Sequence, residues 1–191
     1  NIPKGMYIGD TENSFSFRMA EGLLLLGGGG HRTGKPGGNW ELLRKKAAKW
    51  YPDAKEEYHW SAQDCISLDG FPYIGRYSGR TQNLYVASGF NKWGMTSSMA
   101  AAMILADSIC GKTNDCAPIF SPSRNILTPR MFSNLWEASK NLLTPSPKRC
   151  PHLGCALKWN KAEHSWDCPC HGSRFSESGK IIDNPSTKER R

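Results

Sequence analysis

Two stretches near the C-terminus carry the strongest signal in this sequence: CPHLGC at residues 150–155 and CPCHGS at residues 168–173, with twelve residues between them. They hold four of the seven cysteines and two of the five histidines. An odd number of cysteines, in a chain with no recognisable signal peptide, argues against a disulfide scaffold of the secreted type. The clustering of cysteine with histidine indicates a metal site instead.

Each stretch offers one thiolate and one imidazole, Cys150 with His152 and Cys168 with His171. Two thiolates can hold one iron of a [2Fe–2S] cluster while two neutral imidazoles hold the other, which raises the reduction potential of the cluster. Two cysteines and two histidines also suit tetrahedral Zn²⁺, so structural zinc is the alternative, and a pure disulfide framework is a weaker one. A Cys-x-His spacing is unusual for zinc, and zinc does not call for the remaining cysteines.

Both stretches resemble the ligand loops of the Rieske [2Fe–2S] proteins, and among these the branch of the cytochrome bc and b6f complexes. The resemblance implies that Cys155 and Cys170 form a disulfide that ties the two loops together. It also implies that the Ser173 hydroxyl donates a hydrogen bond to a bridging sulfide of the cluster. Phe175 stands where that branch has a tyrosine whose hydroxyl bonds a ligand sulfur. We therefore expect a reduction potential below that of the cytochrome bc proteins.

A second informative segment runs from residue 84 to residue 107. Residues 84–88 (LYVAS) predict a strand, residues 95–107 predict a helix that stops at Gly111, and glycines occupy the turn between them. Such a turn gathers free backbone N–H groups and the positive end of the helix dipole, which together stabilise negative charge. A reduced flavin carries such charge. A helix that merely follows a strand, with no ligand, is the alternative interpretation.

The surrounding pieces PYIGR, NLYVASGF and GMT, within residues 72–96, resemble the C-terminal FAD-binding part of the D-amino-acid oxidase family, in which this turn lies beside the flavin ring. The resemblance implies FAD contacts from six residues: Gly75, Gly89, Phe90, Gly94, Met95 and Thr96. Residues 14–31 are similar to the substrate-domain sheet of the same family. The order of the pieces resembles the bacterial FAD-dependent oxidoreductases that carry a C-terminal Rieske domain.

This resemblance implies an α+β fold, with part of an FAD-oxidoreductase substrate/FAD domain followed by a small all-β cluster-binding domain. We expect the oxidoreductase part at residues 1–125, a helical linker at 126–148 and a partial Rieske domain at 149–191. The dinucleotide-binding fingerprint of the family is absent, and the Rieske part is short. We therefore expect a partial chain that lacks its N-terminal half, with a further segment lost between about Pro145 and Cys150.

Local patterns predict several further elements. Alternation predicts strands at residues 14–18 and 58–62, and an aliphatic run predicts a buried strand at 23–26. An apolar stripe predicts a helix over 39–50, and residues 157–167 predict a hairpin.

The glycine run at 27–30 and the histidines outside the ligand loops are less specific signals. The four glycines at 27–30 lack the spacing of a phosphate loop and indicate a tight turn close to a ligand. We interpret His31 and His59 as packed or surface residues rather than acid–base groups, and His164 as solvated.

The composition limits the class of protein and the kinds of partner that the chain can have. With 38% hydrophobic and 22% charged residues among 191, the chain is globular rather than disordered. The basic residues behind the net charge of +8 are scattered, so we expect a solvated surface and no nucleic-acid partner. The longest aliphatic run, residues 23–26, is too short to form a transmembrane segment. We expect a cytoplasmic protein, with peripheral attachment to a membrane as the variant.

Together these features predict a flavin-dependent oxidoreductase. Electrons would pass from an amine- or amino-acid-like small-molecule substrate through FAD to the Rieske [2Fe–2S] cluster and then to an acceptor protein. The alternative is a Rieske electron-carrier or binding module whose flavin-like half is only a scaffold. The sequence assigns no catalytic base, and it specifies neither the substrate nor the electron partner.

Overall fold

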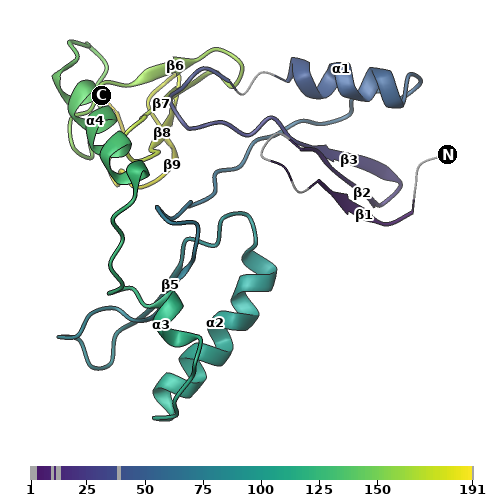
Figure 1. Ribbon diagram of the computed structural model, residues 1–191. Helices are drawn as coiled ribbons and strands as arrows, with labels where there is room; N and C mark the ends of the chain where they lie inside the picture. Colours follow the sequence, from purple (N-terminus) through teal and green to yellow (C-terminus); the bar gives the residue numbers. More distant parts are fainter. Residues whose placement is uncertain (1–3, 10, 12–13, 38–39, 191) are drawn as a thin grey trace. The chain divides into compact units, whose positions relative to one another are not determined.

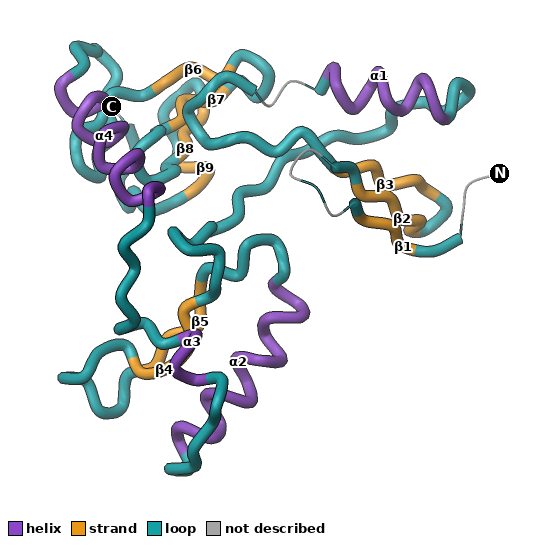
Figure 2. Tube along the Cα trace, in the orientation of Figure 1, coloured by secondary structure: helices purple, strands orange, loops and turns teal. Residues whose placement is uncertain are grey.

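The chain divides into two compact units according to its internal contacts. The computed structural model describes residues 4–9, 11, 14–37 and 40–190 (Figure 1). The first unit combines the described residues up to Ser61 with those from Glu137 onward, and the second runs from Ala62 to Trp136. Helices and short antiparallel strands are mixed along the chain, which confirms the α+β class (Figure 2).

An antiparallel sheet begins the first unit. Its strands, in spatial order, are β1 (Met6–Ile8), β2 (Ser16–Ala20) and β3 (Leu23–Gly27). Gly22, with a φ of 81°, lies in the tight turn that joins β2 to β3. Helix α1 (Glu41–Trp50) contacts β3, and the ring of Trp50 packs 5.1 Å from that of Phe17. Aromatic packing therefore fastens α1 to this sheet.

The second unit is built around a β-hairpin and a long helix. Its regular elements are β4 (Tyr73–Arg76), β5 (Tyr85–Ser88), α2 (Gly94–Ile109) and α3 (Ala117–Phe120). Ile74 of β4 is buried against Ala101 and Ile104 of α2. Helix α2 ends just before Gly111, whose φ of 68° suits the left-handed residue that terminates a helix. This packing sets the direction in which α2 leaves the hairpin.

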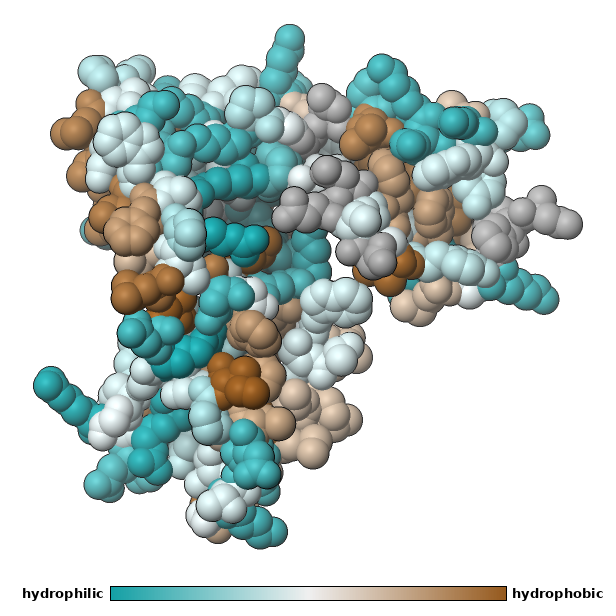
Figure 3. Space-filling model, in the orientation of Figure 1, coloured by the Kyte–Doolittle hydropathy of each residue, from teal (hydrophilic) through white to brown (hydrophobic). Residues whose placement is uncertain are grey.

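Exposed apolar side chains occur on both units, and many appear in brown in the space-filling view (Figure 3). On α2 they include Met95, Met99 and Met103, which are spaced four residues apart and are 91%, 67% and 61% exposed. Residues at that spacing lie on one helical face. An apolar face of this kind is suited to contact with further protein.

Helix α4 (Pro129–Leu143) leads into a four-stranded antiparallel meander. The meander strands are β6 (Lys158–Asn160), β7 (Ser165–Asp167), β8 (Arg174–Ser176) and β9 (Ile181–Asp183). The buried apolar core of this region consists of Cys150, Cys155, Leu157, Cys168 and Phe175. Cysteines make up most of that core. We therefore expect groups bound to their sulfurs to add to the folding stability of this region.

The structure confirms several expected elements and overturns one. The hairpin within residues 157–167 is present as β6–β7, and the strand at 23–26 is present as β3. The helix expected over 39–50 is present as α1 from Glu41 to Trp50, and residue 39 lies outside the described residues. The predicted strand at 58–62 is wrong, because that segment is irregular and leaves Tyr58 and Trp60 75% and 63% exposed. Its side chains alternate, but no strand among the described residues pairs with it.

A buried ion network holds the meander together. The Arg174 side chain, 8% exposed, donates to Asp167 at 3.1 Å and Asp183 at 3.4 Å, and also to Glu163. These carboxylates come from β7, from β9 and from the turn between β6 and β7. A single guanidinium therefore links three parts of the sheet.

We expect Arg174→Met to destabilise the chain by about 3–5 kcal/mol, because it leaves the Glu163 and Asp167 carboxylates without their cation. Denaturant unfolding measures the loss. The matched control is Lys180→Met, which removes an exposed positive charge from the same meander. A loss for Arg174→Met no larger than that for the control would contradict the role of the network.

Candidate functional site

The two cysteine–histidine stretches form loops with the same backbone pattern: ligand loop 1 (residues 150–155) and ligand loop 2 (residues 168–173). In each loop the N–H of the first cysteine donates to the carbonyl of the sixth residue, and the N–H of the glycine at the fifth position donates back to the carbonyl of the first cysteine. All four distances are 2.8–3.0 Å. The two glycines, Gly154 and Gly172, have φ values of 76° and 86°, which glycine adopts at little cost.

The first cysteines of the two loops meet in the protein interior. Cys150 and Cys168 are only 2% and 1% exposed, and their thiols are hydrogen-bonded to each other. This bond raises the pKa of Cys150 and lowers the pKa of Cys168. A pair of adjacent buried sulfurs fits one iron of a [2Fe–2S] cluster.

The two predicted histidine ligands meet on the exposed side of the same loops. The rings of His152 and His171 lie 5.1 Å apart at an angle of 86°. Partial burial, followed by the nearby His152, lowers the pKa of His171 and so favours the neutral imidazole that binds metal. The structure thus brings the four predicted ligands together as a pair of thiols and a pair of imidazoles.

Ser173 is placed to act on these sulfurs. Its side chain is fully buried, its Oγ accepts a hydrogen bond from the N–H of Ser186 at 2.9 Å, and its hydroxyl bonds the Cys150 sulfur. The N–H of Ser186 occupies an acceptor site on the Ser173 oxygen, so the hydroxyl proton of Ser173 remains available for a hydrogen bond to sulfur. A buried donor directed at a sulfur suits a cluster that gains negative charge on reduction. The hydrogen bond from Ser173 to a bridging sulfide stays a prediction.

The disulfide that the resemblance implies is not formed in this structure. Cys155 and Cys170 are free thiols, and their sulfurs and that of Cys168 lie within 4.8 Å of one another. A disulfide requires about 2 Å between its sulfurs. Burial, followed by a hydrogen bond with Cys155, raises the pKa of Cys170 to about 12. The pair is adjacent without being bonded, so the disulfide stays a prediction.

The β5–α2 turn gathers five of the six predicted FAD-contact residues: Gly89, Phe90, Gly94, Met95 and Thr96. Among the described residues, no side chain caps the N-terminus of α2, and its first turn holds no acidic residue. Nothing described lies within 4 Å of the position that a Cβ on Gly94 would occupy. Open N–H groups at a helix N-terminus fit a negatively charged group, as the flavin interpretation requires.

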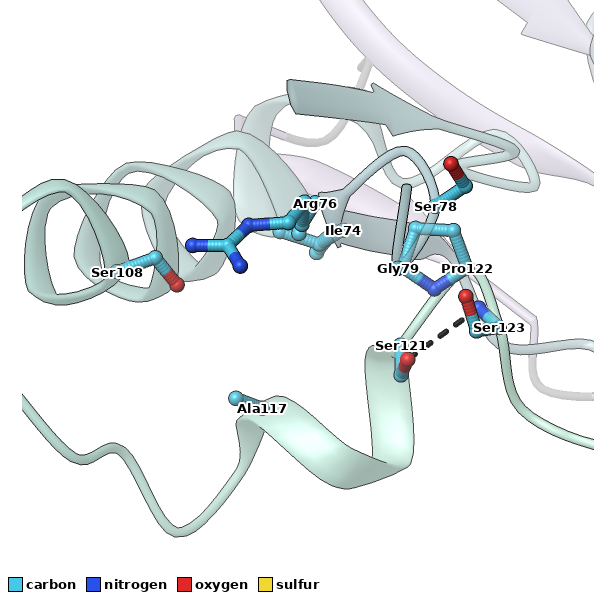
Figure 4. Close-up of a pocket in the computed structure, with 10 residues that line it drawn as sticks. Ile74, Arg76, Ser78, Gly79, Ser108, Ala117, Ser121, Pro122 and Ser123 are labelled. Atoms are coloured by element: carbon cyan, nitrogen blue, oxygen red, sulfur yellow. Dashed lines mark hydrogen bonds between the residues drawn. The ribbon is translucent and has the colours of Figure 1, made fainter. Parts of the chain in front are cut away.

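The sixth predicted FAD contact, Gly75, is not part of this turn but belongs to β4. It pairs with Val86 in the β4–β5 hairpin and lines a cavity of about 220 Å³ (Figure 4). In this cavity the Arg76 guanidinium points toward Ser108 of α2 (Figure 4). The complete lining is Ile74, Gly75, Arg76, Ser78, Gly79, Ser108, Ala117, Ser121, Pro122 and Ser123.

Asn91 fixes the β5–α2 turn with its flanking residues 89–96, here named the flavin-like turn, and the sequence alone did not point to it. Asn91 has a φ of 48°, and its side chain accepts from the Ser67 N–H at 3.0 Å and donates to the Gly70 carbonyl at 2.5 Å. Asparagine tolerates this left-handed backbone and bonds to nearby main chain, so its place between two glycines was the available signal.

An ion pair holds the loop before β4. Arg124 donates through two nitrogens to the Asp69 carboxylate at 2.7 and 2.8 Å, and its guanidinium stacks 4.2 Å from the centre of the Tyr73 ring. These hydrogen bonds lower the pKa of Asp69 to about 2.

A second missed residue, Arg149, joins α4 to ligand loop 1. Its guanidinium donates to the carbonyls of Leu142 at 3.2 Å and Thr144 at 3.0 Å, at the end of α4. It also donates to the carbonyl of Gly154 at 2.6 Å. No local pattern points to this role, because Arg149 contacts main-chain carbonyls that come together only on folding.

The three remaining histidines lie at the surface, in agreement with their interpretation. His59 is exposed and pairs with Glu56 at 2.9 Å. His164 is exposed with its ring 5.9 Å from that of Trp159, and His31 is exposed in the loop after β3.

The Asp69–Arg124 pair predicts a pH-dependent contribution to stability. Because the pKa of Asp69 falls from 3.8 to about 2 on folding, the contribution is present above pH 4 and is lost as the pH falls toward 2. We expect Asp69→Asn to lower the free energy of unfolding at pH 5 by on the order of 1 kcal/mol, since partial exposure screens the pair. This difference should vanish near pH 2 in urea unfolding. The exposed Asp115→Asn is the control, and a difference independent of pH would refute the assignment.

The position of Phe175 predicts an effect on the reduction potential. Its side chain is fully buried against the core that contains Cys150 and Cys168. In Phe175→Tyr we expect a hydroxyl that bonds a ligand sulfur and raises the potential by on the order of 60 mV, as one charge-assisted hydrogen bond does for a one-electron couple. A mediated redox titration measures it. Phe132→Tyr, on an exposed position of α4, should leave the potential unchanged.

A redox titration of the unmodified protein tests the expectation that its reduction potential lies below that of the cytochrome bc proteins. A potential as high as that of the cytochrome bc proteins in the unmodified protein would show that the missing tyrosine hydroxyl has no effect.

Comparison with known proteins agrees with this geometry. Residues 2–108 match the family described as FAD dependent oxidoreductase, and residues 132–190 match the Rieske [2Fe-2S] domain. A protein of Bacillus subtilis named as a Rieske 2Fe-2S iron-sulfur protein, YhfW, is 34% identical over 235 positions, which cover 97% of this chain and 46% of the relative. The alignment is longer than the chain, so it includes segments of the relative without a counterpart here.

Iron–sulfur subunits of the cytochrome b6-f complex match a shorter region. The subunit of Nostoc punctiforme is 51% identical over 37 residues, 19% of this chain and 21% of the subunit. The chloroplastic subunit of Oryza sativa is 43% identical over 51 residues, 26% of this chain and 23% of the subunit. The chain thus spans less than half the length of each of these relatives. No solved structure matches it.

Each of the two matched regions contains one of the two candidate cofactor sites. The flavin-like turn falls within residues 2–108, and both ligand loops fall within residues 132–190. The first match implies FAD and the second a [2Fe–2S] cluster. Among the described helices, none is both long and apolar enough to cross a membrane. The chain belongs to the FAD-dependent oxidoreductase family and continues into a Rieske [2Fe–2S] domain.

Proposed function

We propose that the full-length protein is a flavin-dependent oxidoreductase that delivers electrons through a Rieske [2Fe–2S] cluster to an acceptor protein. An amine- or amino-acid-like substrate is the electron donor. The observation that carries the proposal is the pairing of two buried thiols with two exposed imidazoles on loops of the same backbone pattern. The family matches support a redox role and both cofactors.

Four residues are the proposed ligands of the cluster. Cys150 and Cys168 would hold the cluster through their buried thiols, and His152 and His171 would hold it through their exposed imidazoles. A [2Fe–2S] cluster carries one electron at a time. The exposed histidine edge is the side at which an electron partner can approach.

The flavin-like turn is the proposed contact with FAD. Its open N–H groups at Gly94, Met95 and Thr96 stabilise the negative charge of reduced FAD. Bound FAD would supply two-electron oxidation of the substrate by hydride transfer together with one-electron release, so each substrate oxidation would provide two one-electron transfers. The chain offers no assigned catalytic base, and substrate positioning is the proposed contribution of the oxidoreductase domain.

Spectra and chemical analysis of the full-length protein test the proposal. We expect flavin and Rieske absorbance bands together, with two irons and two acid-labile sulfides per chain. Cys168→Ala should lose the Rieske bands and the iron but keep the flavin bands. The matched control is Cys65→Ala, which removes an exposed thiol outside the ligand loops.

The alternatives give different results in the same experiment. Rieske bands without bound flavin would favour an electron-carrier module with a flavin-like scaffold. Stoichiometric zinc with no visible absorbance would refute both. Anaerobic addition of candidate amines and amino acids then tests the electron path, since a true substrate bleaches the flavin and reduces the cluster in one protein.

A further inference from the structure

The loop after β3 contacts ligand loop 2. We name residues 32–35 the bracing loop. Nη2 of Arg32 donates to the carbonyl oxygen of Pro169 at 3.1 Å. Pro169 is buried and directly follows the predicted ligand Cys168. A cationic group from the FAD-oxidoreductase part of the chain therefore bonds to main chain next to the cluster site.

Gly34 brings the bracing loop still closer to the same residue. A Cβ on Gly34 would lie 2.7 Å from the nitrogen and 2.8 Å from the Cα of Pro169, which are backbone atoms that cannot easily move away. The φ of Gly34 is 73°, a value that disfavours other residues. Glycine at this position therefore permits direct backbone contact between the bracing loop and ligand loop 2.

The bracing loop is also linked to ligand loop 1. Lys35 forms an ion pair with Glu137 of α4. The other carboxylate oxygen of Glu137 accepts from the Asn141 amide at 3.3 Å. The carbonyl of the buried Asn141 accepts from the N–H of Ala156 at 2.9 Å, one residue beyond ligand loop 1. One short loop is thus connected to both halves of the cluster site.

We propose that the bracing loop positions the cluster ligand loops, and that Arg32 is a positioning residue that raises the reduction potential of the cluster. The reduced cluster carries one more negative charge than the oxidised cluster, so a nearby cation stabilises the reduced form. The bond to Pro169 also fixes the backbone from which the Cys168 sulfur projects. This inference rests on the proposed function, in which the cluster accepts electrons from the flavin of the same chain. The oxidoreductase domain would then help to set the reduction potential of that acceptor.

Three variants of the full-length holoprotein test the proposal. We expect Arg32→Met to lower the midpoint potential in a mediated titration, and Arg32→Lys to lower it less, because lysine keeps the charge but loses the guanidinium fork. Gly34→Ala should alter the g-values of the reduced cluster in electron paramagnetic resonance and slow flavin-to-cluster electron transfer about tenfold or more, since small displacements have large kinetic effects. The control Lys45→Met removes one positive charge from α1, where Lys45 pairs with Glu41.

The outcomes separate this inference from the proposed function. Equal potentials and g-values in Arg32→Met, Lys45→Met and the unmodified protein would overturn the role of Arg32. An Arg32→Met variant that keeps its flavin but loses iron, while Lys45→Met keeps both, would support bracing. Should Gly34→Ala not fold, the comparison of Arg32→Lys with Arg32→Met decides. If the unmodified flavin never reduces the cluster, the electron path fails, while the mediated titration still decides whether Arg32 sets the potential.

Discussion

The C-terminal site depends on two main-chain hydrogen bonds that recur in each ligand loop. They close six residues into a ring, with a left-handed glycine at the fifth position, and they fix the direction in which the first cysteine projects. Because both loops share this geometry, Cys150 and Cys168 meet in the interior while His152 and His171 meet at the surface. Most other residues in place of Gly154 or Gly172 would be strained at these positive φ values and would act against this arrangement.

The loops need external support because the apolar core beneath them is small and consists largely of cysteine. Arg149 and Asn141 attach ligand loop 1 to α4, the bracing loop contacts ligand loop 2, and Arg174 links the strands of the meander. Most of these contacts are polar, and most involve main-chain carbonyls. A polar framework of this kind fixes geometry in a domain that has little hydrophobic surface to bury.

Local sequence was a good guide wherever a short-range interaction determines the structure. The β6–β7 hairpin, α1, α2 and β3 were predictable from periodicity and turn residues. The ligand set, read from the spacing of cysteine and histidine, stays a prediction. The prediction failed at residues 58–62, where alternation of side chains had no partner strand among the described residues. Gly75, which the resemblance implies as an FAD contact, pairs with Val86 in the β4–β5 hairpin and lines a cavity there, and its contact with FAD stays a prediction.

The sequence by itself determined the donor atoms of the site, because sulfur and imidazole chemistry depends on residue type and the loops are closed by contacts within six residues. The tertiary structure decided which groups surround those donors. Arg32, Asn141 and Ser186 lie outside the ligand loops and reach them through hydrogen bonds that each involve a main-chain atom, which carries no residue-specific pattern. Such contacts exist only once the chain is folded, since they require the close approach of segments that local periodicity does not relate.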